Sequence, residues 1–169
     1  MDPVARAAKP PELFHTGIVV PDLERAMSRF EDAFGFQFLE PRHNPGTARV
    51  DAGVFAAETL LTMSTNDGHR IELIQQLDAP AYENLPTRTH HLGFWSSDLP
   101  GHMAQLDRHG FDSRLVGVDP TDDSDSFSFH FDADTGLWIE LLSTNRSPAF
   151  AEWLASGART TRHVGEATP

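Results

Sequence analysis

Two histidines and two glutamates at repeated positions have the types and surroundings needed to bind a metal ion. His15 and His91 each begin an apolar segment and are followed two residues later by a glycine, while Glu72 and Glu140 each lie between an isoleucine and a leucine. A carboxylate buried without a partner costs several kcal/mol, so each glutamate needs a cation, a metal or a cluster of hydrogen bonds. Together the two imidazoles and two carboxylates could supply four of the six ligands of a divalent ion and leave the rest for water or substrate.

The composition narrows the choice of ion and leaves one alternative open. The chain has no cysteine, which excludes disulfides, thiolate zinc sites and cysteine nucleophiles together. Mixed nitrogen and oxygen ligation suits zinc, nickel, cobalt, manganese or ferrous iron, and we expect one such ion. In the alternative, the histidines pair with the glutamates as buried hydrogen-bonded couples without a metal.

These residues belong to an internal repeat of the sequence. Residues 15–23 align with residues 91–99 at an offset of 76, sharing His, Gly, Asp and Leu, and residues 68–73 align with residues 136–141 at an offset of 68. Each aligned segment keeps its polar residue, histidine in the first pair and glutamate in the second. The repeat makes the four residues two copies of one His and Glu pair, which strengthens the metal hypothesis.

Each copy is expected to run strand, helix, strand, strand, strand. Asp22 and Asp98 can cap the two helices, because an aspartate accepts hydrogen bonds from the free amides of a first turn. The alignment through these caps selects His91 over its neighbour His90 as the partner of His15. We expect helices over residues 23–34 and 99–109, and further strands near residues 50–55, 59–64, 113–118 and 126–132.

The chain is long enough for one packed body and too short for two independent domains of ordinary size. The repeat predicts a flexible tail over residues 1–11, a first module over 12–75, a linker over 76–87 and a second module over 88–145. Residues 146–169 are expected to form a C-terminal helix, near 148–156, and a tail.

Charge and hydropathy exclude several classes of function. The net charge of -12, without a basic cluster, argues against nucleic-acid binding and weakly disfavours polyanionic substrates such as acyl-CoA thioesters, although a local positive pocket could override it. No apolar run approaches the roughly 18 residues that a membrane span needs. The N-terminal segment has no apolar stretch typical of a secretory signal, so we expect a cytoplasmic protein.

Over residues 12–145 the chain resembles the vicinal oxygen chelate superfamily, which includes glyoxalase I, methylmalonyl-CoA epimerase, fosfomycin-resistance proteins and extradiol dioxygenases. The matching motifs are the two His-x-Gly segments that lead to Asp-Leu, and the two Ile-Glu-Leu segments preceded by glycine. The resemblance implies an α+β fold in which two tandem βαβββ modules form an open, cup-shaped mixed sheet with helices outside. It also implies that one metal is held by His15, Glu72, His91 and Glu140.

The resemblance further implies the kind of reaction. An isomerase, epimerase or lyase of this type removes a proton next to a carbonyl and stabilises a metal-bound enolate of a small molecule with vicinal oxygens. Glu140 or Glu72 could serve as the base, and Glu140 is favoured. Asp51 stands where epimerases carry a catalytic glutamate, whereas Glu72 departs from the glutamine common there and brings the ligand set nearer to glyoxalase I. Modules of this superfamily also pair between chains, so a homodimer is an open expectation.

One further residue could contribute to catalysis. The segment 126–132 alternates three phenylalanines with Ser128, His130 and Asp132. If the polar face lines the cup, His130 is a candidate acid or base. If the aromatic face lines it, the site accepts a hydrophobic or ring-bearing compound.

Two alternatives of a different functional class share the same fold. An extradiol-type dioxygenase would use ferrous iron with two histidines and one glutamate, and Glu72 argues against it because a fourth protein ligand occupies a position that dioxygen or catechol needs. A metal-free module that binds drugs, as in bleomycin-resistance proteins, would not need the four-residue set.

Overall fold

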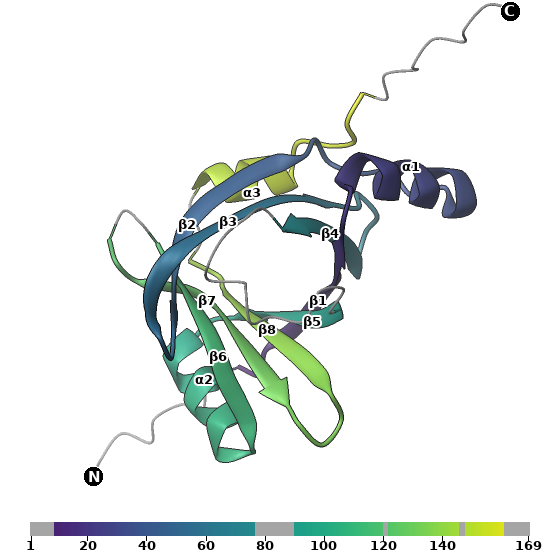
Figure 1. The fold of residues 1–169 in the computed structure, drawn as a ribbon. Helices are drawn as coiled ribbons and strands as arrows, with labels where there is room; N and C mark the ends of the chain where they lie inside the picture. Colours follow the sequence, from purple (N-terminus) through teal and green to yellow (C-terminus); the bar gives the residue numbers. More distant parts are fainter. Residues whose placement is uncertain (1–8, 77–89, 120–121, 146–147, 161–169) are drawn as a thin grey trace, which may run out of the picture.

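The computed structural model describes residues 9–76, 90–119, 122–145 and 148–160 (Figure 1). Most of the expected N-terminal tail, nearly all of the expected linker over residues 76–87, and the end of the C-terminal tail lie outside the described residues. Among the helices that are described, none is long and apolar enough to cross a membrane.

The elements follow the expected order twice. The first module consists of β1 (Glu12–Val20), α1 (Leu23–Phe34), β2 (Arg42–Val50), β3 (Gly53–Met63) and β4 (Arg70–Gln76). The second consists of β5 (His90–Ser96), α2 (Leu99–Arg108), β6 (Phe111–Val118), β7 (Asp125–Asp132) and β8 (Leu137–Ser143), and α3 (Pro148–Leu154) follows it. The α+β class and the paired βαβββ modules are therefore confirmed.

The strands form one mixed sheet in the order β1-β4-β3-β2-β6-β7-β8-β5. Within each module the first and last strands pair in parallel, β1 with β4 and β5 with β8. Two antiparallel seams join the modules, β1 with β5 and β2 with β6. The second seam pairs residues 47–49 with 116–118 and closes the sheet into a barrel, where the sequence resemblance implied an open cup (Figure 1).

The prediction of one strand near residues 50–55 is wrong. The chain reverses there: β2 ends at Val50, Asp51 and Ala52 form the turn, and Gly53 at a φ of 136° begins β3 opposite Val50. Because Val50 and Phe55 both favour strands, the apolar residues on either side of the turn looked like a single element. Glycine tolerates this positive φ, which residues with a side chain rarely adopt.

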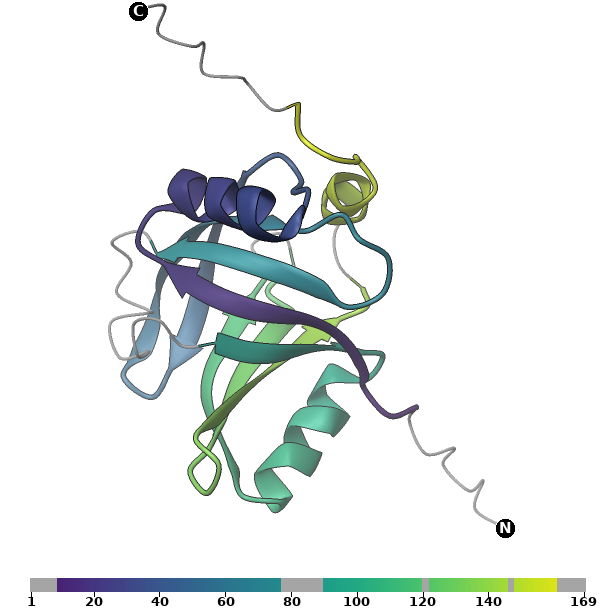
Figure 2. The same cartoon turned by 90° about the vertical axis from the view of Figure 1, so that its right-hand side faces the viewer.

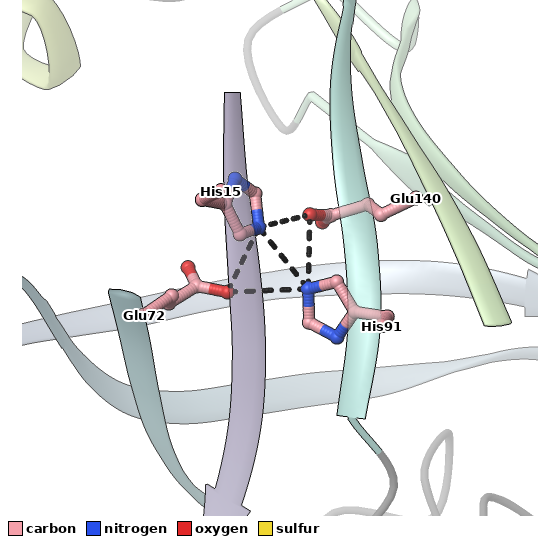
Figure 3. Close-up of side chains that lie close together, drawn as sticks. All are labelled: His15, Glu72, His91 and Glu140. Carbon is pink, nitrogen blue, oxygen red and sulfur yellow. Dashed lines mark hydrogen bonds and ion pairs between the residues drawn. The ribbon is translucent and has the colours of Figure 1, made fainter. Parts of the chain in front are cut away.

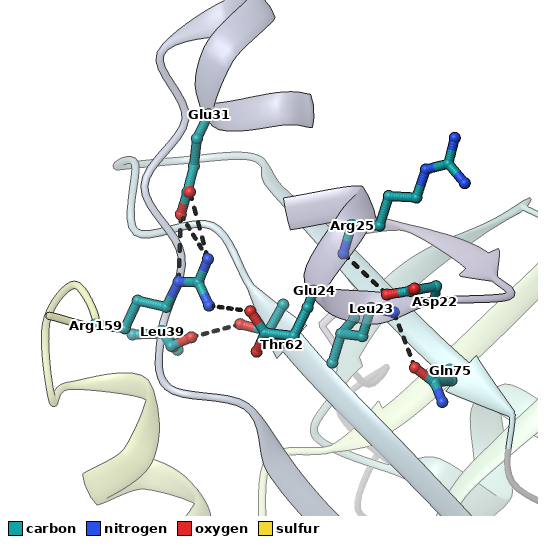
Figure 4. Close-up of polar contacts among 9 residues, drawn as sticks. All are labelled: Asp22, Leu23, Glu24, Arg25, Glu31, Leu39, Thr62, Gln75 and Arg159. Carbon is teal, nitrogen blue, oxygen red and sulfur yellow. Dashed lines mark hydrogen bonds and ion pairs between the residues drawn. The ribbon is translucent and has the colours of Figure 1, made fainter. Parts of the chain in front are cut away.

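The two long helices begin where the sequence predicted. The Asp22 carboxylate accepts a hydrogen bond from the Arg25 amide at 2.9 Å (Figure 4). The Asp98 carboxylate accepts one from the Gly101 amide at 3.1 Å. Both helices lie outside the barrel (Figure 2) and pack their apolar faces on strand residues that point outward. The apolar residues of α1 belong to a cluster made of Leu23, Met27, Phe38 and Leu73. The apolar residues of α2 belong to a second cluster made of Leu99, Ile139 and Leu141.

The segment after the second module returns to the first. The Trp153 indole on α3 donates to the Glu40 carbonyl at 2.8 Å, and the Arg42 guanidinium lies over the Phe150 ring. Beyond α3, the Arg159 guanidinium contacts Glu24 and Glu31 on α1 (Figure 4). The C-terminal segment therefore ties the two modules together in addition to the sheet.

Replacing Asp22 with alanine should lower the free energy of unfolding by about 1 kcal/mol, because the first turn of α1 loses the acceptor of one of its free amides. Thermal or urea unfolding measures the change. Asp22→Asn, which keeps a cap acceptor, is the matched control and should stay close to the wild type. Equal losses in both variants would show that the aspartate acts through its charge and not as a cap.

Candidate metal centre

The four residues singled out in the sequence meet at one point inside the barrel (Figure 3). His15 comes from β1, Glu72 from β4, His91 from β5 and Glu140 from β8, which are adjacent strands on either side of the β1 and β5 seam. All four are buried, and one ligand atom from each lies within 4.8 Å of the others. The structure thus brings together the whole expected ligand set.

Strand register explains why they meet. In the antiparallel seam His15 lies opposite Gly93, and His91 lies opposite Gly17. A Cβ atom on Gly17 would lie 1.9 Å from Cε1 of His91, and one on Gly93 would lie 2.0 Å from Cε1 of His15. Each imidazole therefore occupies the space that a side chain on the neighbouring strand would need, so both positions require glycine.

The distances within the group suit a divalent ion. Nε2 of His15 lies 3.1 Å from Oε2 of Glu140 and 3.3 Å from Oε2 of Glu72, and Nε2 of His91 lies 3.4 Å from both oxygens. The two imidazole nitrogens are 3.1 Å apart. Ligands at about 2.0–2.2 Å from a metal, with angles between octahedral and tetrahedral, lie about 2.8–3.6 Å from one another.

The group also contains buried polar atoms that need a partner. Oε2 of Glu72 and Oε2 of Glu140 are inaccessible to solvent and have no well-aligned hydrogen bond among the described residues, although both lie within ion-pair distance of the histidines. Buried carboxylate oxygens without a donor are costly. Converging, inaccessible oxygen and nitrogen ligands of this kind fit a metal ion.

Electrostatics keep the group charge-balanced. Burial alone would lower the pKa of His15, but the charge of Glu72 and contact with Glu140 outweigh it and raise the pKa to about 10. The pKa of His91 is raised and that of Glu140 is lowered by the same contacts, against the effect of burial. The two carboxylates therefore favour positive charge on the imidazoles, and a divalent cation bound between the four side chains would supply that positive charge.

Aromatic side chains line the barrel next to this group. The Phe129 ring meets the His91 ring edge-on, with centroids 5.0 Å apart. Phe129 belongs to an apolar cluster with Ala48, Leu115 and Trp138, on which Phe55, Phe127 and Phe131 also pack. Of the two faces considered for residues 126–132, the aromatic one points inward.

His130 is directed away from the group. It is fully buried on the other face of β7, where Nε2 lies 3.0 Å from Oγ of Ser128 and Nδ1 lies 3.7 Å from Oδ1 of Asp107 on α2. Since alternate residues of a strand point to opposite faces, the inward position of Phe129 excludes His130 from the inner surface. The sequence left both faces open, and the structure does not bring His130 to the site.

Asp51 also lies apart from the four residues. It is exposed in the turn between β2 and β3 and lines a surface pocket with Asp107, Phe111, Asp112, Ser113 and Arg114. The group of ligand atoms does not include it. The candidate catalytic role of Asp51 therefore has no support from its position.

Arg70 is an inward-facing residue that the sequence did not single out. It precedes Glu72 by two residues on β4, and its Cα atom lies opposite that of His15. The signal was present in the aligned repeat, where arginine in one copy replaces tryptophan in the other.

Comparisons with known proteins agree with this architecture. A family model described as the Glyoxalase/Bleomycin resistance protein/Dioxygenase superfamily matches residues 14–131. Comparison with curated protein sequences finds no significant match.

Similar solved structures include methylmalonyl-CoA epimerases. The enzyme from Mycobacterium tuberculosis is 23% identical with a TM-score of 0.50, and the match covers 83% of this chain and 91% of that one. A variant of the Streptomyces coelicolor enzyme in complex with 2-nitronate-propionyl-CoA is 17% identical with a TM-score of 0.54, over 80% of this chain and 98% of that one. At such identities the likeness concerns the fold.

The buried position of His130 predicts a pH dependence of stability. Burial lowers its pKa below the ordinary 6.5, and Asp107 offsets only part of that effect. Below about pH 6.5 the His130 imidazole takes up a proton more readily in the unfolded chain than in the folded chain. Its contribution to the free energy of unfolding therefore becomes more unfavourable to the folded state as the pH falls. In His130→Gln the melting temperature should fall less than in the wild type between about pH 7.5 and pH 5.5.

The exposed His109 provides the control for that measurement. His109→Gln should keep the wild-type dependence of melting temperature on pH. Equal slopes for His130→Gln and the wild type would contradict the assigned burial effect.

Proposed function

The chain belongs to the glyoxalase/bleomycin resistance protein/dioxygenase superfamily, and we propose that it is a metal-dependent isomerase, epimerase or lyase. In this proposal it removes a proton next to a carbonyl group of a small molecule. The observation that carries the proposal is the buried group of two histidines and two glutamates on the inner face of the barrel.

His15, Glu72, His91 and Glu140 would hold one divalent ion. Their atoms have suitable separations, and the glycines opposite both histidines leave each ring its space. When bound, such an ion supplies Lewis-acid stabilisation of negative charge that develops on a substrate oxygen. A nitrogen and oxygen ligand set is compatible with zinc, nickel, cobalt, manganese or iron.

Glu140 is our candidate for the base, and Glu72 is its counterpart in the other module. Burial would raise the pKa of Glu140, but contacts with His15 and His91 outweigh it and lower the pKa, so the carboxylate is ionised and can accept a proton. Glu140 lies opposite Phe129 on β7, whereas Glu72 lies opposite Met63 on β3. The Glu140 side of the group therefore has an aromatic neighbour, whereas the Glu72 side has a flexible thioether.

The substrate is proposed to present two neighbouring oxygens. Some of the similar solved structures are complexes with methylmalonyl-CoA or with 2-nitronate-propionyl-CoA. This chain has a net charge of -12, which opposes the approach of a polyanion. We therefore favour a small carbonyl compound over a CoA thioester.

Gly17→Ala should weaken binding of zinc or nickel by about tenfold or more, because the added methyl group displaces the His91 ring and ligand positions tolerate little change. Calorimetric titration of the chelator-treated protein measures the affinity. Thr16→Ala changes the adjacent residue, on the opposite face of β1, and should bind metal as the wild type does. Wild-type protein that binds none of the divalent ions tested would overturn the metal proposal.

Glu140→Gln should lower the rate of proton abstraction by about a hundredfold or more while the fold persists, because the amide cannot act as a general base. Nuclear magnetic resonance in heavy water follows deuterium exchange at the carbon next to the carbonyl in diacetyl and in methylmalonyl-CoA. Metal content and melting temperature are measured on the same samples.

Glu72→Gln is the symmetry-matched control. A larger loss of exchange in this variant would assign the base to Glu72. Turnover that requires dioxygen and iron would instead support an extradiol-type dioxygenase, and the absence of exchange in metal-loaded wild-type protein with either compound would contradict an isomerase acting on vicinal oxygens.

A further inference from the structure

Arg70 lies on the inner face of the barrel beside the candidate metal centre. Residues of β4 alternate, so Arg70 shares the face of Glu72, while Ile71 and Leu73 pack outward in the apolar cluster under α1. The pairing of β1 with β4 runs without irregularity from His15 opposite Arg70 to Val20 opposite Gln75. Arg70 therefore lies two residues before Glu72 on the same face of β4.

This guanidinium is not paired within the described part of the chain. Its Nη1 atom is inaccessible to solvent and has no hydrogen-bond partner, and no ion pair joins Arg70 to a carboxylate among the described residues. By contrast, Arg49 and Arg159 on the outside of the barrel both contact carboxylates. A buried donor on a charged group is costly when it lacks an acceptor, so its presence on the inner surface points to an anionic ligand.

The two modules differ at this position although their four proposed ligands match. Arg70 corresponds in the repeat to Trp138, just as Glu72 corresponds to Glu140. The Trp138 ring packs against the Phe131 ring, with centroids 5.0 Å apart and planes tilted by 43°, and it belongs to the apolar cluster inside the barrel. One side of the site is therefore aromatic and the other carries an unpaired positive charge.

We infer that Arg70 binds the carboxylate of the substrate, and that the substrate is a small carboxylic acid with an apolar or aromatic body. This inference rests on the proposed function for the position of the reacting carbon, but the contact itself involves a residue outside the ligand set. A guanidinium presents a pair of parallel donors that match a carboxylate. Arg70 supplies one positive charge, and the chain has a net charge of -12, so the site suits a ligand with one carboxylate better than a polyanion.

Mandelate and mandelamide test this inference, because they have nearly the same shape and differ in the negative charge. Calorimetry of the chelator-treated protein, in which no metal ion can favour the carboxylate, should give at least about tenfold tighter binding of mandelate, the size expected of a charge-assisted hydrogen bond. Arg70→Gln should abolish that preference by weakening mandelate binding and leaving mandelamide binding unchanged. Arg70→Lys should retain part of it.

Arg29→Gln is the matched control, since it removes the same charge from the exposed face of α1. An equal loss of mandelate binding in this variant would reduce the effect to net charge and overturn the inference. A preference for mandelate that survives Arg70→Gln would overturn it as well. The melting temperature of Arg70→Gln should be no lower than that of the wild type, because the variant removes an unpaired buried donor, and its metal content should be unchanged.

A second measurement applies where mandelate is a poor ligand. The side-chain resonance of Arg70, assigned by its loss in Arg70→Lys, should shift saturably on titration with acetate in chelator-treated protein. No shift with acetate, together with no preference for mandelate, would overturn the inference. Because this titration needs no metal, its failure is distinct from failure of metal binding or of deuterium exchange into neutral diacetyl, which test the proposed function.

Discussion

The antiparallel register between β1 and β5 is the constraint on which the site depends. It places His15 opposite Gly93 and His91 opposite Gly17, so that each imidazole ring lies over a glycine, where no side chain blocks it. Parallel pairing then brings Glu72 beside Gly17 and Glu140 beside Gly93. A shift of one residue in the seam would turn one strand over relative to the other, so that the two histidines would lie on opposite faces of the sheet.

Burying four ionisable groups is unfavourable, and the rest of the fold compensates for it. Apolar clusters beneath α1 and α2 hold the outer faces of the same strands that carry the group inside. The seam between β2 and β6 closes the barrel, and the C-terminal contacts of Trp153 and Arg159 add a second connection between modules. Mutual charge balance, or a bound cation, offsets the remaining cost.

The two modules agree at the proposed ligand positions and differ at the residues that surround them. The His and Glu pair is identical in both copies because all four atoms converge on one point. The neighbouring positions do not converge and differ between the copies, with Arg70 against Trp138 and Met63 against Phe129. A symmetric centre thus lies in an asymmetric environment, which allows it to distinguish the two ends of a ligand.

The sequence by itself determined the features that depend on local pattern. The repeat predicted both modules and the four converging residues, and Asp22 and Asp98 predicted the helix starts, because caps and periodicity act within a few residues. Only the tertiary structure decided the closure of the barrel, the inward face of β7 and the unpaired state of Arg70. These depend on which strands pair and in which register, and such contacts join residues far apart in the chain.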